Sequence, residues 1–164
     1  MLALLIITFG VFARVLVHIP NFTPILSLAL FGGMYLKGRQ GVWVPLVLMA
    51  LSDIFIGFHD TMIFTWGSIL LISFMGIWLK EHKSYTNVIA VSLVSSIGFF
   101  VITNFGSFLS LYPHTLAGLQ QCYILAIPFY RSTVASTVVY SLLLFSLWEF
   151  LLARGKNSVL VKLL

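Results

Sequence analysis

The sequence is poor in charged residues and in cysteine, and both shortages limit what the protein can be. Only 8% of its 164 residues are charged, whereas an average soluble domain has about 25%. So few charges cannot cover a folded domain with a water-facing surface. Disorder is excluded because 60% of the residues are hydrophobic, and nucleic-acid binding is not expected because basic residues form no dense patch. The single cysteine, Cys122, rules out an intramolecular disulfide.

What the sequence does contain is long apolar runs, with a mean hydropathy of +1.10. They predict an all-α integral membrane protein in which residues 1–164 form one six-helix bundle. The first run lacks a basic leader and a small-residue cleavage site, so we expect it to be retained as a helix. The spans are expected at residues 1–17, 24–36, 42–58, 62–79, 87–109 and 127–153.

The second run is unusually short for a membrane span. It would rise only about 20 Å as a helix, against a hydrocarbon core of about 30 Å. We therefore expect a short second helix that is either completed by a loop dipping into the protein or is re-entrant.

The basic residues predict the orientation. Seven of the nine basic residues lie in three segments, and two spans separate each segment from the next, so all three lie on the same side of the membrane. The positive-inside rule makes that side cytoplasmic. With six crossings, both termini are then cytoplasmic. The remaining polar residues gather at the outer face, which predicts a pocket that opens outward. The seven basic residues are Lys37, Arg39, Lys80, Lys83, Arg154, Lys156 and Lys162.

Ten residues at this outer end are candidate ligand contacts. Asp53 is the sharpest, because a carboxylate inside a span costs about 2.5–3.5 kcal/mol and usually faces a cavity or a partner; its alternative role is a structural pair with Arg14 or Arg131. Arg131 suits a carboxylate or phosphate, or it reaches lipid headgroups. The ten are Asn21, Thr23, Asp53, His59, Asn104, Tyr112, His114, Cys122, Tyr123 and Arg131.

Several of these candidates have an alternative, structural interpretation. Asn21 and Thr23 suit either a pocket or the N-terminal cap of the short second helix. Residues 110–126 form the longest connection and are expected to be an outer loop that folds over the bundle mouth as a lid. The four histidines have no metal-ligand spacing, so we expect no metal site and no cofactor.

Several short motifs, in their order and spacing, resemble a family of small bacterial integral membrane proteins without an assigned function. That family in turn resembles the substrate-binding (S) components of energy-coupling-factor vitamin transporters in size, topology and placement of polar residues. The resemblance implies an inner-membrane protein that holds a small, vitamin-like solute under its outer loops. The motifs are Pro20-Asn21-Phe22-Thr23-Pro24, Ala29–Gly33, Ser52-Asp53, Thr103-Asn104-Phe105, Tyr112–Thr115, Gly118-Leu119, Cys122-Tyr123 and Ala126–Phe129.

The resemblance also implies an energising module as a partner, but one feature departs from the pattern. S components that dock on the shared module usually carry alanine-x-x-x-alanine on helix one. Here that segment offers Ala3, Gly10 and Ala13, which lack this spacing, so a solitary mode of action stays open.

Two other functions were weighed against solute binding. A membrane-embedded structural or assembly subunit predicts polar residues scattered as packing contacts rather than gathered at one face. An intramembrane enzyme is not expected, because Glu81 and Glu149 lie away from Asp53 and Gly106-Ser107 is not a nucleophile elbow. No glycine-rich nucleotide loop is present, so active transport would take its energy from another protein.

Overall fold

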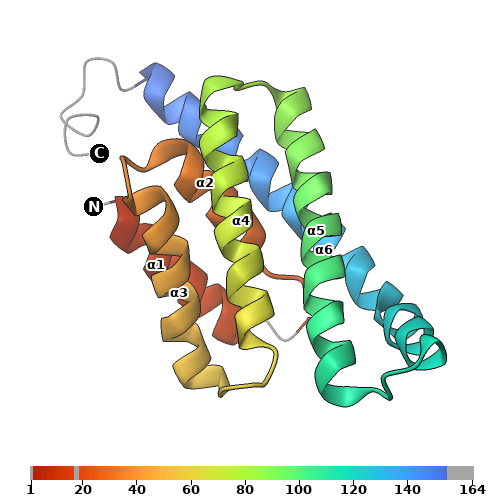
Figure 1. The fold of residues 1–164 in the computed structure, drawn as a ribbon. Helices are drawn as coiled ribbons and strands as arrows, with labels where there is room; N and C mark the ends of the chain where they lie inside the picture. The colour runs from red at the N-terminus through yellow and green to blue at the C-terminus, as the bar shows by residue number, and fades with distance from the viewer. Residues whose placement is uncertain (1, 17–18, 155–164) are drawn as a thin grey trace.

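The computed structural model describes residues 2–16 and 19–154, and in these ranges the secondary structure consists of six α-helices (Figure 1). This confirms the expected helical class and the number of helices. Lys156 and Lys162, which entered the orientation argument, lie outside the described residues. The helices are α1 (Leu2–Leu16), α2 (Ile25–Tyr35), α3 (Gln40–Ile56), α4 (Met62–Glu81), α5 (Tyr85–Leu111) and α6 (Leu116–Arg154).

Three helices, α4, α5 and α6, are long and apolar enough to cross a membrane, while α1 to α3 are shorter apolar helices. The outer surface of the bundle is also apolar: Phe55 is 71% exposed and Ile63 is 78% exposed. Serines, in contrast, lie in the interior, and Ser52, Ser73 and Ser96 are fully buried. Apolar exposed faces combined with small polar residues between helices are typical of packing in a bilayer. The fold is that of a membrane protein.

The turns divide between the two ends of the bundle. The α2–α3 turn, the α4–α5 turn and the C-terminal end of α6 lie at one end, the upper one in Figure 1. These segments carry five of the basic residues: Lys37, Arg39, Lys80, Lys83 and Arg154. The α3–α4 and α5–α6 turns lie at the opposite end. We call the two ends the basic end and the polar end.

Helix α2 is the central element of the bundle. Every residue from Ile25 to Met34 is buried, as expected for a helix that is apolar on all sides. It lies against α4 at Gly33 and Gly76, where the two backbones touch directly. A Cβ atom at Gly33 would overlap the backbone oxygen of Ser73, and one at Gly76 would overlap that of Leu30. Glycine is therefore required at both positions.

The short second helix is present, and the connection before it enters the bundle. Helix α2 has 11 residues, which rise only about 16 Å. In the 19–24 connection, Phe22 and Thr23 are partly buried, Pro24 is buried, and Asn21 adopts a left-handed conformation with φ of 57°. The interpretation of Asn21 and Thr23 as caps of this helix is wrong. Its N-cap is Pro24, which has no side-chain hydrogen bond within the described residues.

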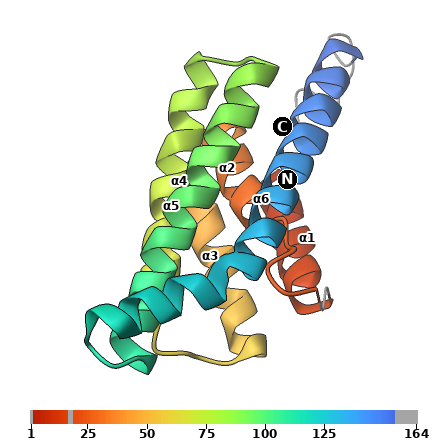
Figure 2. The same cartoon turned by 90° about the vertical axis from the view of Figure 1, so that its right-hand side faces the viewer.

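The expected outer loop over residues 110–126 is also wrong, because most of this segment is helical. Helix α5 continues to Leu111 and α6 begins at Leu116, so only residues 112–115 connect them. Gly118 and Pro128 look like helix breakers in the sequence. However, α6 continues through Pro128, which membrane helices tolerate, and Gly118 permits close contact with Pro113. The first part of α6 runs obliquely across the polar end (Figure 2).

Candidate functional site

A cavity lies at the start of α2, where residues of all six helices and of two connections meet. It consists of two adjoining hollows of about 130 and 330 Å³, and Arg14, Asn21, Thr65, Phe99 and Thr133 line both. We call the two together the polar cavity. The smaller hollow is also lined by Thr23, Ile25, Leu26, Met49 and Ser136. The larger is also lined by His59, Phe100, Thr103, Asn104, Ser107, Ala126, Phe129 and Tyr130.

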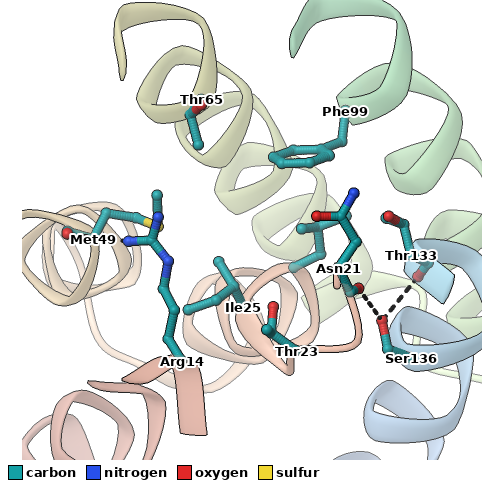
Figure 3. Close-up of a pocket in the computed structure, with 10 residues that line it drawn as sticks. Arg14, Asn21, Thr23, Ile25, Met49, Thr65, Phe99, Thr133 and Ser136 are labelled. Atoms are coloured by element: carbon teal, nitrogen blue, oxygen red, sulfur yellow. Dashed lines mark hydrogen bonds between the residues drawn. The ribbon is translucent and has the colours of Figure 1, made fainter. Parts of the chain in front are cut away.

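The elements that form the polar cavity place it toward the polar end. Arg14 comes from the last turn of α1, Asn21 from the 19–24 connection and His59 from the α3–α4 turn. Helices α4, α5 and α6 complete the wall. Figure 3 shows Arg14 and Asn21 on opposite sides of the smaller hollow, with Thr65 and Phe99 facing them from α4 and α5. Helix α2 begins only at Ile25, so no turn of this helix fills the space before that residue. The polar cavity occupies this space.

The charged group of the cavity is held by a buried network. The Arg14 Nη1 atom forms an ion pair with Asp53 Oδ1 and donates to Ser52 Oγ at 2.6 Å. The Trp66 indole Nε1 donates to the other carboxylate oxygen, Asp53 Oδ2, at 2.7 Å. Asp53 is fully buried, and these contacts give each of its two oxygens a hydrogen-bond partner inside the protein. This is the structural pair with Arg14 that was one of the two interpretations of Asp53.

The same network leaves part of the Arg14 guanidinium available. Within the described residues, all hydrogen bonds of Arg14 come from Nη1, although the group has five N–H donors. The Nε and Nη2 donors therefore remain for a molecule in the polar cavity, which Arg14 lines. Asp53 acts on the cavity through Arg14, whose orientation it fixes.

The hydroxyl groups of the wall have a common arrangement. Thr65 donates to the Thr61 carbonyl at 3.2 Å and Thr103 to the Phe99 carbonyl at 2.7 Å. Ser107 donates to the Thr103 carbonyl at 3.2 Å, and Thr133 donates to the Phe129 carbonyl at 3.0 Å. Each side chain bonds one helical turn back, which is usual for serine and threonine within helices.

Aromatic rings form the remaining wall of the larger hollow. Phe100 and Tyr130 pack with ring centroids 4.8 Å apart, and Phe99 and Phe129 line the same space. These rings stand among converging polar groups, and aromatic side chains combined with placed polar groups are typical of sites that bind small molecules.

The structure brings five of the ten predicted residues to this site. Asn21, Thr23, His59 and Asn104 line the polar cavity, and Asp53 holds Arg14 there. Asn104 donates through Nδ2 to the Phe100 carbonyl at 2.7 Å, so one amide proton and the amide oxygen remain available.

The other five lie along α6 and at the α5–α6 turn. Cys122 is buried with its thiol toward the Asn104 carbonyl at 3.3 Å, and the Tyr123 hydroxyl donates to the Val101 carbonyl at 2.8 Å. His114 contacts the Leu109 carbonyl through Nε2 at 3.0 Å. Tyr112 is the C-cap of α5, and Arg131 is exposed. These contacts attach the first part of α6 to α5.

Sequence reasoning missed most of the cavity wall. Thr103 and Thr133 give no sign of a cavity in the sequence, because small residues recur every four positions around them and this spacing is typical of close helix packing. The available signal was on α5, where Phe100, Thr103 and Ser107 recur at helical spacing beside Asn104 and so share one face with it. No group of three or more histidine, cysteine or acidic side chains within the described residues is placed to hold a metal ion.

The helical bundle, its apolar surface and its internal cavity define a small helical membrane protein. Residues 1–159 match the family of unknown function DUF6580, and the chain belongs to that family. Comparisons with curated proteins and with solved structures gave no match.

Proposed function

We propose that this protein is a solute-binding component of membrane transport, of the S-component type, which captures a small molecule in the polar cavity. The observation that carries the proposal is the cavity itself. It combines a fixed guanidinium, several hydroxyl groups and aromatic rings around about 330 Å³ in its larger hollow. Pockets for small molecules have volumes of about 300–1,000 Å³ and similar linings. A solute of the size of a vitamin fits a volume of this range.

The distribution of basic residues supports capture from outside the cell. The basic end carries the residues that the positive-inside rule assigns to the cytoplasm. The polar cavity lies toward the opposite end, where His59 of the α3–α4 turn reaches it. In the bacterial inner membrane this end faces outward, with both termini in the cytoplasm.

This orientation predicts the result of reporter fusions. A reporter fused after Leu164 or inserted between Lys80 and Lys83 should report the cytoplasm, because the end of α6 at Arg154 and the α4–α5 turn lie at the basic end. A reporter in the α3–α4 turn, at His59-Asp60, should report the periplasm and serves as the control. Periplasmic signal from either of the first two fusions contradicts the outward-facing cavity.

Alternative functions receive less support. A structural or assembly subunit does not need a cavity with unfilled hydrogen-bond donors, such as Nε and Nη2 of Arg14. For an enzyme, no acidic side chain is among the described lining residues, and Asp53, which holds Arg14 there, has both oxygens bonded inside the protein. The function that we propose is therefore binding without chemical conversion.

A transport role requires an energy source or a partner with one. The partner would be an energising module, which uses the protein as its substrate-binding subunit. Helix α1 lacks the alanine pattern that usually mediates such docking, so action without the shared module is the alternative mode.

The proposal is tested by identifying small molecules that co-purify with the protein. The protein is expressed in its membrane, purified in mild detergent and denatured, and the released molecules are analysed by mass spectrometry. Ser107→Phe fills the larger hollow, whereas Ser110→Phe places the same ring on an exposed position one turn further along α5. A solute should co-purify with the wild type and with Ser110→Phe, and it should be depleted in Ser107→Phe. Equal recovery from all three, or no recovered solute, contradicts the proposal.

A further inference from the structure

The hydrogen-bonding groups of the polar cavity restrict what its solute can be, and this inference rests on the proposed function. A hydroxyl has one proton and two lone pairs. Thr65, Thr103, Ser107 and Thr133 all give their proton to a main-chain carbonyl. Each therefore offers the cavity only a hydrogen-bond acceptor. A solute that fits this wall must bring N–H or O–H donors.

The donors of the cavity come from Arg14 and Asn21, which lie on opposite sides of the smaller hollow. Nε and Nη2 of Arg14 are available there, as are the amide protons of Asn21, which lines both hollows. These groups require an acceptor on the solute, such as a carbonyl or carboxylate oxygen. The solute therefore carries both hydrogen-bond acceptors and hydrogen-bond donors.

The charges decide between a carbonyl and a carboxylate. Arg14 is the only arginine or lysine among the described lining residues, and its charge is already balanced by the fully buried Asp53. An anionic solute would leave one uncompensated negative charge in the interior of the bundle, and a cationic solute one positive charge. Both are unfavourable in a medium of low dielectric constant. An uncharged solute leaves the network balanced.

The aromatic wall adds a restriction on shape. Phe99, Phe100, Phe129 and Tyr130 surround the larger hollow, and Phe100 and Tyr130 lie in mutual contact. Flat rings stack favourably against such side chains.

We propose that the polar cavity takes an uncharged, flat, amide-bearing molecule, whose carbonyl oxygen accepts from Arg14 and whose N–H groups donate to the hydroxyls of α4, α5 and α6. Aromatic carboxamides and cyclic amides have this combination. The corresponding carboxylates have the same shape but carry a charge and lack the N–H donors, so they provide a matched comparison.

The test compares two such pairs by saturation-transfer NMR on the purified full-length protein in detergent. The probes are benzamide with benzoate and nicotinamide with nicotinate, each at millimolar concentration, with N,N-dimethylbenzamide as an amide without donors. The signals of benzamide and nicotinamide should exceed those of their acids several-fold. They should persist in Ser110→Phe and fall to background in Ser107→Phe. N,N-dimethylbenzamide should give the weak signal of the acids.

The outcomes separate this inference from the function on which it rests. Stronger signals for benzoate and nicotinate that disappear in Ser107→Phe would overturn the uncharged-amide proposal and leave solute binding intact. Equal signals for benzamide and N,N-dimethylbenzamide would overturn the role of the hydroxyl acceptors. Failure of every probe to show a signal that depends on Ser107 would also overturn the uncharged-amide proposal, whereas solute binding itself is decided by the molecules that co-purify with the wild type.

Discussion

Replacing Asp53 with asparagine should lower the free energy of unfolding by about 3–5 kcal/mol, the usual cost of breaking a buried ion pair. Asparagine has nearly the shape of aspartate and can still accept from Trp66. However, it leaves the guanidinium of Arg14 without its counter-charge, and the Arg14 side chain is only 15% exposed. The measurement is the thermal stability of the purified protein in detergent, followed by size-exclusion chromatography after heating.

A double variant separates stability from solute binding. Arg14→Gln together with Asp53→Asn removes both charges, so it should recover much of the stability that the single variant loses. It should not recover solute binding, because Nε and Nη2 of Arg14 are absent. A single Asp53→Asn protein as stable as the wild type would contradict the buried pair. A double variant that binds as well as the wild type would contradict the role of Arg14.

The second large effect is expected at the contact between α2 and α4. Gly76→Ala should destabilise the protein by about 1–3 kcal/mol, the range for overpacking a filled interior. The added Cβ atom would overlap the backbone oxygen of Leu30, and a backbone atom cannot rotate away as a side chain can. Separation of the two helices would also move the 19–24 connection, which holds Asn21 at the cavity. The measurement is again thermal stability in detergent.

Gly67 provides the matched control for this substitution. Gly67 lies in the same helix, and a Cβ atom there would have no neighbouring atom within 4 Å in the described part of the protein outside its own helical backbone. Gly67→Ala should therefore leave the melting temperature unchanged or raise it slightly, because alanine favours the helix. Equal effects of the two substitutions would show that the α2–α4 contact is looser than the structure indicates.

The helices were largely predictable from the sequence because each apolar run ends in charged, glycine or proline residues. The pair of Arg14 and Asp53 was predictable as one of two alternatives, since unpaired charges are unfavourable inside a membrane. The first part of α6 was not predictable by the same rules. Gly118 and Pro128 usually end helices in water, but in this bundle packing against α5 supports the helix through both.

The polar cavity could be predicted only in part. Asn21, Thr23, His59 and Asn104 attracted attention because polar groups are rare in this chain. Thr103 and Thr133 did not, because a hydroxyl inside a helix bonds to its own backbone whether it faces a neighbouring helix or a cavity. Which of these it faces depends on the length of α2, and therefore on how the helices assemble. The spacing on α5 shows that Thr103 and Ser107 share a face with Asn104, but it does not show whether that face meets a helix or a cavity.

The most direct test of an outward-open cavity is the accessibility of Ser107 in intact cells. In a Cys122→Ala background, Ser107→Cys is treated with a membrane-impermeant maleimide, and Gly38→Cys in the α2–α3 turn is the control for the cytoplasmic side. We expect Ser107→Cys to be labelled in intact cells, at a rate that falls when benzamide occupies the cavity, and Gly38→Cys to be labelled only after the membrane is permeabilised. Labelling of Gly38→Cys in intact cells, with Ser107→Cys labelled only after permeabilisation, would contradict the account.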